Sequence, residues 1–104
     1  MSEPAGANGA PGEDAPIVRV LEICNKKGLH ARASAKFVQT VEKFDAEVTV
    51  TRGHESVGGT SIMGLMMLAA GPGCTITVSA TGKQAREAVE ALAALISGRF
   101  TEEE

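Results

Sequence analysis

The sequence predicts an α+β domain whose elements follow the order βαββαβα. Two observations predict this class: four short segments are rich in β-branched residues or alternate apolar and polar residues, and three others place apolar residues at helical spacing. Because the strands are apolar on one side, we expect a four-stranded antiparallel sheet with one face covered by helices and the other in water. The 104 residues are enough for one such domain.

The first half of the predicted domain contains three strands and one helix. Residues 17–24, "IVRVLEIC", predict a strand, and residues 31–43 predict a helix. Residues 46–52, "AEVTVTR", alternate cleanly, and a turn then leads to a short returning strand at 55–57. The apolar positions expected to face inward are Ala31, Ala35, Phe37, Val38 and Val41 in the helix, Phe44 just after it, and Val48 and Val50 in the strand.

The second half contains a short helix, the last strand and the last helix. Thr60-Ser61 supplies N-cap chemistry for a helix at 62–68, which "AGPG" ends. Residues 74–80, "CTITVSA", alternate with Ile76 and Val78 inward, and residues 84–97 predict the last helix, which ends at Gly98. Its apolar stripe is Ala85, Val89, Leu92 and Ile96.

The two ends of the chain differ from the predicted domain at 17–100. Residues 1–16 contain no branched aliphatic side chain, so we expect a disordered tail, and residues 101–104, "TEEE", predict a solvated acidic end. The tail lacks the basic start and apolar run of a secretory signal. Together with Cys24 and Cys74, which we expect to be reduced thiols used in packing, this predicts a cytoplasmic protein.

Charge and hydropathy exclude two further classes. The net charge of −3 argues against nucleic acid as the main partner. The longest apolar stretch, "IMGLMMLAA", is far too short to span a bilayer, so we expect no membrane association.

The segment "NKKGLHARASAKF", residues 25–37, concentrates cations where a helix begins. A helix N-terminus is already positive, so Lys26, Lys27 and Arg32 there oppose the helix dipole, and the simplest compensation is a visiting anion. Next to that end, we expect His30 to be a neutral imidazole, which is a nucleophile, and its attack on phosphorus would place negative charge at the most positive point. Gly28 lets the backbone approach closely. The same residues also fit a solvated N-cap beside a lysine-decorated loop.

The stretch "SIMGLMMLAA" has more apolar residues than one face of a two-turn helix can bury. We expect Leu65 and Leu68 to point inward, and Ile62, Met63 and Met66 to form a partly exposed docking patch, for which flexible methionines are suited. The alternative is that all of them are core residues.

Two motifs, "GLHARASAKFVQ" and "SIMGLMMLAA", together resemble the HPr family, the histidine phosphocarriers of the bacterial phosphoenolpyruvate-dependent phosphotransferase system. The resemblance runs from about Ile17 to Phe100 and implies an open-faced β-sandwich with three helices on one face of the sheet. It implies phosphorylation of His30 at Nδ1, with Arg32 holding the phosphoryl group. By the same resemblance, Ser61 is the site of a regulatory kinase; a plain N-cap is the alternative reading.

The resemblance also implies the partners and the class of function. Ile62, Met63 and Met66 match the patch that docks enzyme I and IIA-type proteins, so we expect a monomeric phosphoryl carrier that needs no cofactor or metal and is not a turnover enzyme. The alternative is a binding module that regulates kinases or metabolic regulators according to its phosphorylation state.

One position departs from the pattern of the family. Ala33 stands where proline is common, which frees one more N–H group in the first turn and leaves the details of phosphoryl geometry open. In this substitution and in its long N-terminal tail, the chain resembles the nitrogen-related branch of the family.

Overall fold

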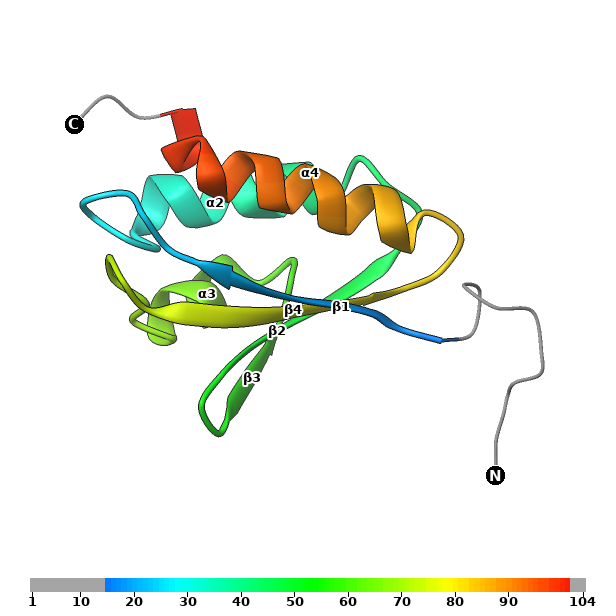
Figure 1. Ribbon diagram of the computed structural model, residues 1–104, viewed down its shortest axis with the longest axis horizontal. Coiled ribbons are helices and arrows are strands. Elements are labelled where there is room, and N and C mark those ends of the chain that lie inside the picture. Colours follow the sequence, from blue (N-terminus) through cyan, green and yellow to red (C-terminus); the bar gives the residue numbers. More distant parts are fainter. Residues whose placement is uncertain (1–14, 102–104) are drawn as a thin grey trace.

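A computed structural model describes residues 15–101, which form a four-stranded antiparallel sheet with helices against one face (Figure 1). The sheet order is β1-β4-β2-β3, and all three neighbouring pairs are antiparallel. The strands are β1 (Ile17–Glu22), β2 (Glu47–Arg52), β3 (Glu55–Gly58) and β4 (Thr75–Thr81). The predicted α+β class and the order βαββαβα are therefore confirmed.

Two of the helices lie across the sheet, and the third is shorter. Helices α2 (Ala31–Val41) and α4 (Ala85–Ser97) lie side by side over the sheet (Figure 1). Helix α3 (Ile62–Met67) packs against α2 and β3. A 3-10 turn, η1 (Arg99–Thr101), follows α4. The helix boundaries match the predicted ones to within about two residues, and Gly98 is the C-cap of α4, as predicted.

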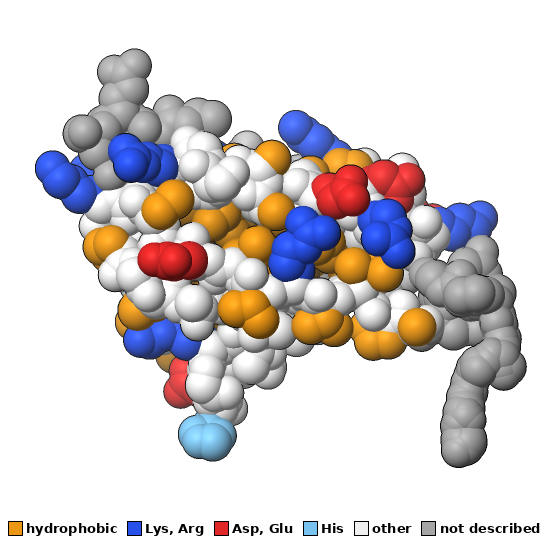
Figure 2. Space-filling view, viewed as in Figure 1, with side chains coloured by type: hydrophobic (Ala, Val, Ile, Leu, Met, Phe, Trp, Pro, Cys, Tyr) orange, Lys and Arg blue, Asp and Glu red, His pale blue; other side chains and the backbone are white. Residues whose placement is uncertain are grey.

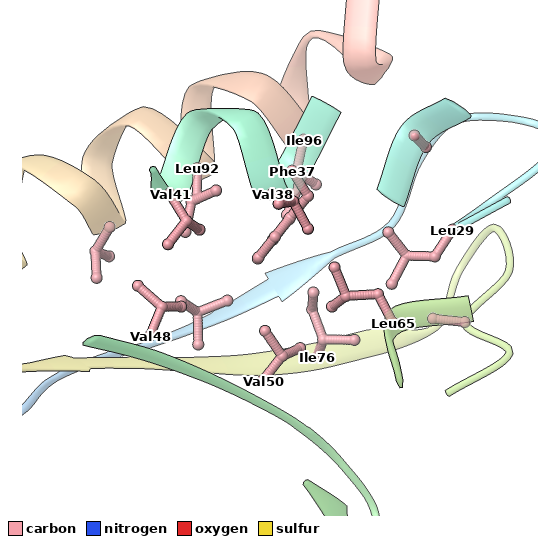
Figure 3. Close-up of a cluster of buried hydrophobic side chains, with 14 of the residues drawn as sticks. Leu29, Phe37, Val38, Val41, Val48, Val50, Leu65, Ile76, Leu92 and Ile96 are labelled. Atoms are coloured by element: carbon pink, nitrogen blue, oxygen red, sulfur yellow. The ribbon is translucent and has the colours of Figure 1, made fainter. Parts of the chain in front are cut away.

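The core lies between the helices and the inner face of the sheet (Figure 3). Val48, Val50, Ile76 and Val78 alternate with polar neighbours along β2 and β4 and point to this core, as predicted. The predicted stripe of α4 is also confirmed, because its four members Ala85, Val89, Leu92 and Ile96 are all buried.

The buried face of α2 differs by one position from the predicted face. Ala31 is exposed, whereas Ala33 is fully buried with Phe37 and Val41. The two alanines flank Arg32, and alanine is too small for its apolar character to decide which of them faces inward. The placement of Ala31 in the core was therefore wrong.

The other face of the sheet is open to solvent. Val18 and Val20 of β1 are 57% and 63% exposed, and Thr49 of β2 is exposed on the same face. Figure 2 shows hydrophobic side chains spread along the β1 edge with charged ones between them. Among residues 15–101, no helix has the length and apolar character needed to cross a membrane.

The predicted ends fall mostly outside this structure. Of the predicted tail at 1–16, only Ala15 and Pro16 are described, and both are exposed ahead of β1. Of the predicted acidic end, only Thr101 is described, as the last residue of η1; the other residues of both segments lie outside the described range.

Both cysteines are free thiols, as predicted, but Cys24 is exposed, so the expected packing role is wrong for it, whereas Cys74 is half-buried against the core. Their side chains have different partners. Cys24 Sγ lies 3.2 Å from the carbonyl oxygen of Ile96 at the end of α4, whereas Cys74 Sγ lies 3.4 Å from Nη2 of Arg52. The backbones meet instead: Ile23 N–H donates to the carbonyl oxygen of Cys74 at 2.8 Å.

Candidate functional site

His30 is the N-cap residue of α2. Its backbone is extended (φ −75°, ψ −176°), and its Nδ1 accepts hydrogen bonds from the N–H groups of Arg32 and Ala33 at 3.1 and 3.4 Å. A ring nitrogen that accepts hydrogen bonds carries a lone pair and no proton, so in this arrangement the proton of the neutral ring is on Nε2. The lone pair of Nδ1 therefore lies at the positive end of the helix.

His30 is neither fully buried nor fully exposed. The residue as a whole is half-buried, and its Nε2 atom is on the buried side. His30 therefore keeps part of its surface in contact with solvent.

The surroundings of His30 are cationic. Lys26, Lys27 and Arg32 are all exposed, and the first turn of α2, which is described completely, contains no acidic residue. Exposed N–H groups at a helix start attract anions, and nearby cations add to that attraction. The structure thus leaves these cations at the surface on both sides of His30 along the chain, and their role toward an anion stays a prediction.

Two buried polar residues shape the loop before His30. The side-chain Nδ2 of Asn25 donates to the carbonyl oxygen of Gly28 at 2.9 Å, and the hydroxyl of Ser34 donates to the carbonyl oxygen of Leu29 at 3.2 Å. Both side chains are fully buried. Sequence reasoning missed these supports, because a short polar residue at a strand end or in a helix is ordinarily a surface residue.

The same loop rests on the turn that follows α3. Leu29 N–H donates to the carbonyl oxygen of Ala70 at 3.0 Å. Gly28 has a positive φ of 63°, and a Cβ atom placed on it would lie 2.2 Å from the same oxygen. Gly28 therefore packs closely against the backbone of this turn, whereas its close approach to an anion stays a prediction.

Ser61 is the N-cap of α3, as predicted. Its backbone is extended, and its hydroxyl oxygen accepts a hydrogen bond from Gly64 N–H at 2.9 Å. The residue is exposed, so the hydroxyl lies at the surface of the protein.

Helix α3 exposes one apolar face. Leu65 and Leu68 are buried, as predicted, and the four exposed side chains, which we call the α3 surface, are Ile62 (40%), Met63 (70%), Met66 (39%) and Met67 (72%). Exposure of the first three was predicted. Met67 was missed, although it lies four residues after Met63 and so on the same helix face.

The fold and the site define a small one-sided α+β sandwich that presents a helix-capping histidine amid cations. A family model described as the phosphorylation site of the HPr component of the phosphotransferase system matches residues 17–98. The chain belongs to the HPr family.

Curated relatives and solved structures agree with this family. The chain is 54% identical over 84 residues to phosphocarrier protein HPr of Neisseria meningitidis serogroup A, which covers 81% of this chain and 94% of that protein. It is 43% identical over 86 residues to phosphocarrier protein NPr of Shewanella violacea, covering 83% and 94% of the two chains.

The structure is similar to those of known HPr proteins. A crystal structure of HPr-C-His from Thermoanaerobacter tengcongensis matches with a TM-score of 0.80 and 42% identity, over 85% of this chain and 99% of that one. HPr from Bacillus anthracis matches with a TM-score of 0.76 and 40% identity, over 80% and 99%. The open-faced HPr fold inferred from the two motifs is thereby confirmed.

Proposed function

We propose that this chain is a phosphocarrier whose His30 accepts a phosphoryl group at Nδ1 from phosphorylated enzyme I and passes it to a IIA-type protein. The observation that supports this most is the position of Nδ1 at the start of α2, 3.1 Å from Arg32 N–H and 3.4 Å from Ala33 N–H. A neutral imidazole with a lone pair on this nitrogen, on a residue that is half-buried as a whole, is a nucleophile.

Transfer needs one bond to form as another breaks. The lone pair of Nδ1 attacks phosphorus, and the bond from phosphorus to its donor atom on enzyme I breaks with its electron pair. In the second transfer, a nucleophile on the IIA-type protein attacks phosphorus, and the Nδ1–phosphorus bond breaks with its electron pair returning to Nδ1. Phosphoryl oxygens on Nδ1 would replace its lone pair as acceptors for the N–H groups of Arg32 and Ala33. Stabilisation then comes from positioning and charge, as in other phosphoryl transfers.

Arg32 has the chemistry to hold the phosphoryl group. Its guanidinium offers donors in a planar fork that fits a phosphate, and the residue is exposed two positions after His30. We assign Lys26 and Lys27 a weaker role as point charges that attract an anionic partner.

The α3 surface is the proposed docking site for enzyme I and the IIA-type protein. Methionine side chains are flexible and polarizable, which suits a surface that serves several partners. Because α3 packs against α2, a partner bound to this surface lies close to the helix that begins at His30. We propose that the carrier is a monomer that meets these partners in the cytoplasm. It would need no metal or cofactor.

Phosphorylation of Ser61 by an HPr kinase is the proposed regulation. The hydroxyl is exposed, and the α3 surface begins at the next residue, Ile62. A phosphate there would add charge beside an apolar contact and would repel an acidic partner, so docking would weaken while the domain stays folded.

Incubation with phosphoenolpyruvate and enzyme I tests the carrier function. The wild-type chain should gain one acid-labile phosphate, and His30→Ala should gain none. His54→Ala is the matched control, because His54 is exposed in the turn between β2 and β3 and should not affect labelling. Equal labelling of wild type and His30→Ala would overturn the proposal.

The exposure of the α3 surface also favours a second function. The chain would then be a binding module that controls kinases or metabolic regulators according to its phosphorylation state, with transfer secondary. His30→Ala separates the two functions, because a carrier loses all downstream phosphorylation, whereas a pure binding module keeps control of its partners.

A further inference from the structure

Arg52 lies at the end of β2, and its guanidinium contacts the C-terminal end of α3. Its position continues the inward alternation of Val48 and Val50, and the residue is half-buried. Nη1 donates a hydrogen bond to the carbonyl oxygen of Leu68 at 2.8 Å, and Nη2 donates to Sγ of Cys74 at 3.4 Å. One guanidinium therefore contacts two points that are separated along the chain.

Those two points are the ends of a single turn. The turn at 68–74 leaves α3 through Ala69, whose φ is +55°, and closes with Cys74 N–H donating to the carbonyl oxygen of Gly71 at 3.0 Å. A non-glycine residue with positive φ is strained, so this turn needs external support to keep its shape.

The middle of this turn is hydrogen-bonded to the loop that leads to His30. The carbonyl oxygen of Ala70 accepts the Leu29 N–H at 3.0 Å, and Gly28 packs against the same oxygen. Leu29 directly precedes His30. A shift of the turn would therefore move the backbone that sets the position of the imidazole.

Arginine is suited to this task in a way that lysine is not. Its fork of N–H donors reaches two acceptors at once with fixed geometry, whereas an ammonium is a single point charge. The last carbonyl groups of α3 have no partners further along the helix, and a cation beside them also complements the negative end of the helix dipole.

We propose that Arg52 is a positioning residue for phosphoryl transfer at His30, because it clamps both ends of the turn on which the Gly28–Leu29 backbone rests. This inference rests on the proposed carrier function. Transfer between proteins requires near-attack geometry, and small displacements of a reacting atom lower the rate strongly.

The test compares Arg52→Met, Arg52→Lys and the control Arg86→Met. Arg86 is exposed in the first turn of α4 and loses the same charge without touching the turn. At a temperature well below unfolding, we expect Arg52→Met to lower kcat for phosphorylation by enzyme I about tenfold with KM unchanged, Arg52→Lys to fall between it and wild type, and Arg86→Met to match wild type.

Hydrogen exchange at the Leu29 amide supplies a second measurement that does not depend on transfer. In Arg52→Met, this exchange should accelerate about tenfold or more relative to amides in the centre of α4. Unchanged kcat and unchanged Leu29 exchange, with a lower melting temperature only, would make Arg52 merely structural. A rise in KM alone would assign it to docking. Both results overturn the proposal, whereas absence of labelling in the wild type would overturn the carrier function instead.

Discussion

Gly28 lies directly against the carbonyl oxygen of Ala70, with no space for a side chain between them. A Cβ atom on Gly28 would approach that oxygen to 2.2 Å. The contact joins the loop before His30 to the turn after α3, so the proposed phosphorylation site and the α3 surface share one backbone junction.

Gly28→Ala should be strongly destabilising. The substitution combines the cost of a positive φ with the overlap at Ala70, so we expect a loss of about 3 kcal/mol in the free energy of unfolding, measured with urea. Gly53→Ala is the matched control, because Gly53 has a φ of 62° but a Cβ atom on it would meet no other atom within 4 Å. It should cost only about 1–2 kcal/mol. Equal losses for the two variants would contradict the close contact.

Ala69→Gly should stabilise the protein. Glycine relieves the strain of φ +55° at this exposed position but gains freedom in the unfolded chain, so a net stabilisation of about 0.5–1 kcal/mol is expected. Thermal unfolding should show a rise of about 4 °C. Ala94→Gly, at an exposed position inside α4, is the control and should destabilise the protein by about 1 kcal/mol. A lower melting temperature in both variants would show that Ala69 is unstrained.

Ser61→Asp should weaken docking without unfolding the domain. Aspartate also serves as an N-cap, so the melting temperature should barely change, whereas the new charge beside the α3 surface should raise KM for enzyme I about tenfold. Ser61→Ala gives the opposite pattern, with a loss of about 1 kcal/mol in stability and an unchanged KM. Extensive unfolding of the aspartate variant would mean that Ser61 is chiefly structural.

Met63→Gln should reduce transfer but not stability. The side chain is 70% exposed, so little packing is lost on substitution, and kcat/KM with enzyme I should fall about tenfold if it is a docking residue. Val20→Thr is the matched control, since Val20 is 63% exposed on the open face of the sheet and should leave transfer unchanged. An equal effect of both changes would show that the α3 surface has no special role.

The arrangement of elements could be predicted from the sequence because the apolar pattern differs clearly between strands and helices. Val48 and Val50 alternate, and Val89 and Leu92 follow a helical stripe, and all four are buried. His30 and Ser61 could be placed at helix starts for the same reason, because the apolar pattern begins just after each of them. These signals are local, and tertiary contacts do not override them in this fold.

Contacts between distant segments could not be predicted in this way. Phe100 is fully buried with a φ of 56°, and its carbonyl oxygen lies 2.6 Å from Nζ of Lys36, a residue 64 positions away. Nothing in either local sequence indicates that pairing. The hydrogen bonds of Arg52 to Leu68 and Cys74 could not be predicted either, because a charged residue at the end of a strand ordinarily points to solvent.

In the proposed function, the Nδ1 atom of His30 holds the phosphoryl group. It is tested most directly by labelling the imidazole rings with ¹⁵N, phosphorylating the chain with phosphoenolpyruvate and enzyme I, and recording coupling between phosphorus and nitrogen by NMR. We predict coupling to Nδ1 of His30, with changes in the amide signals of Arg32 and Ala33. Phosphorus on Nε2 of His30, on His54 or on no histidine would contradict the account.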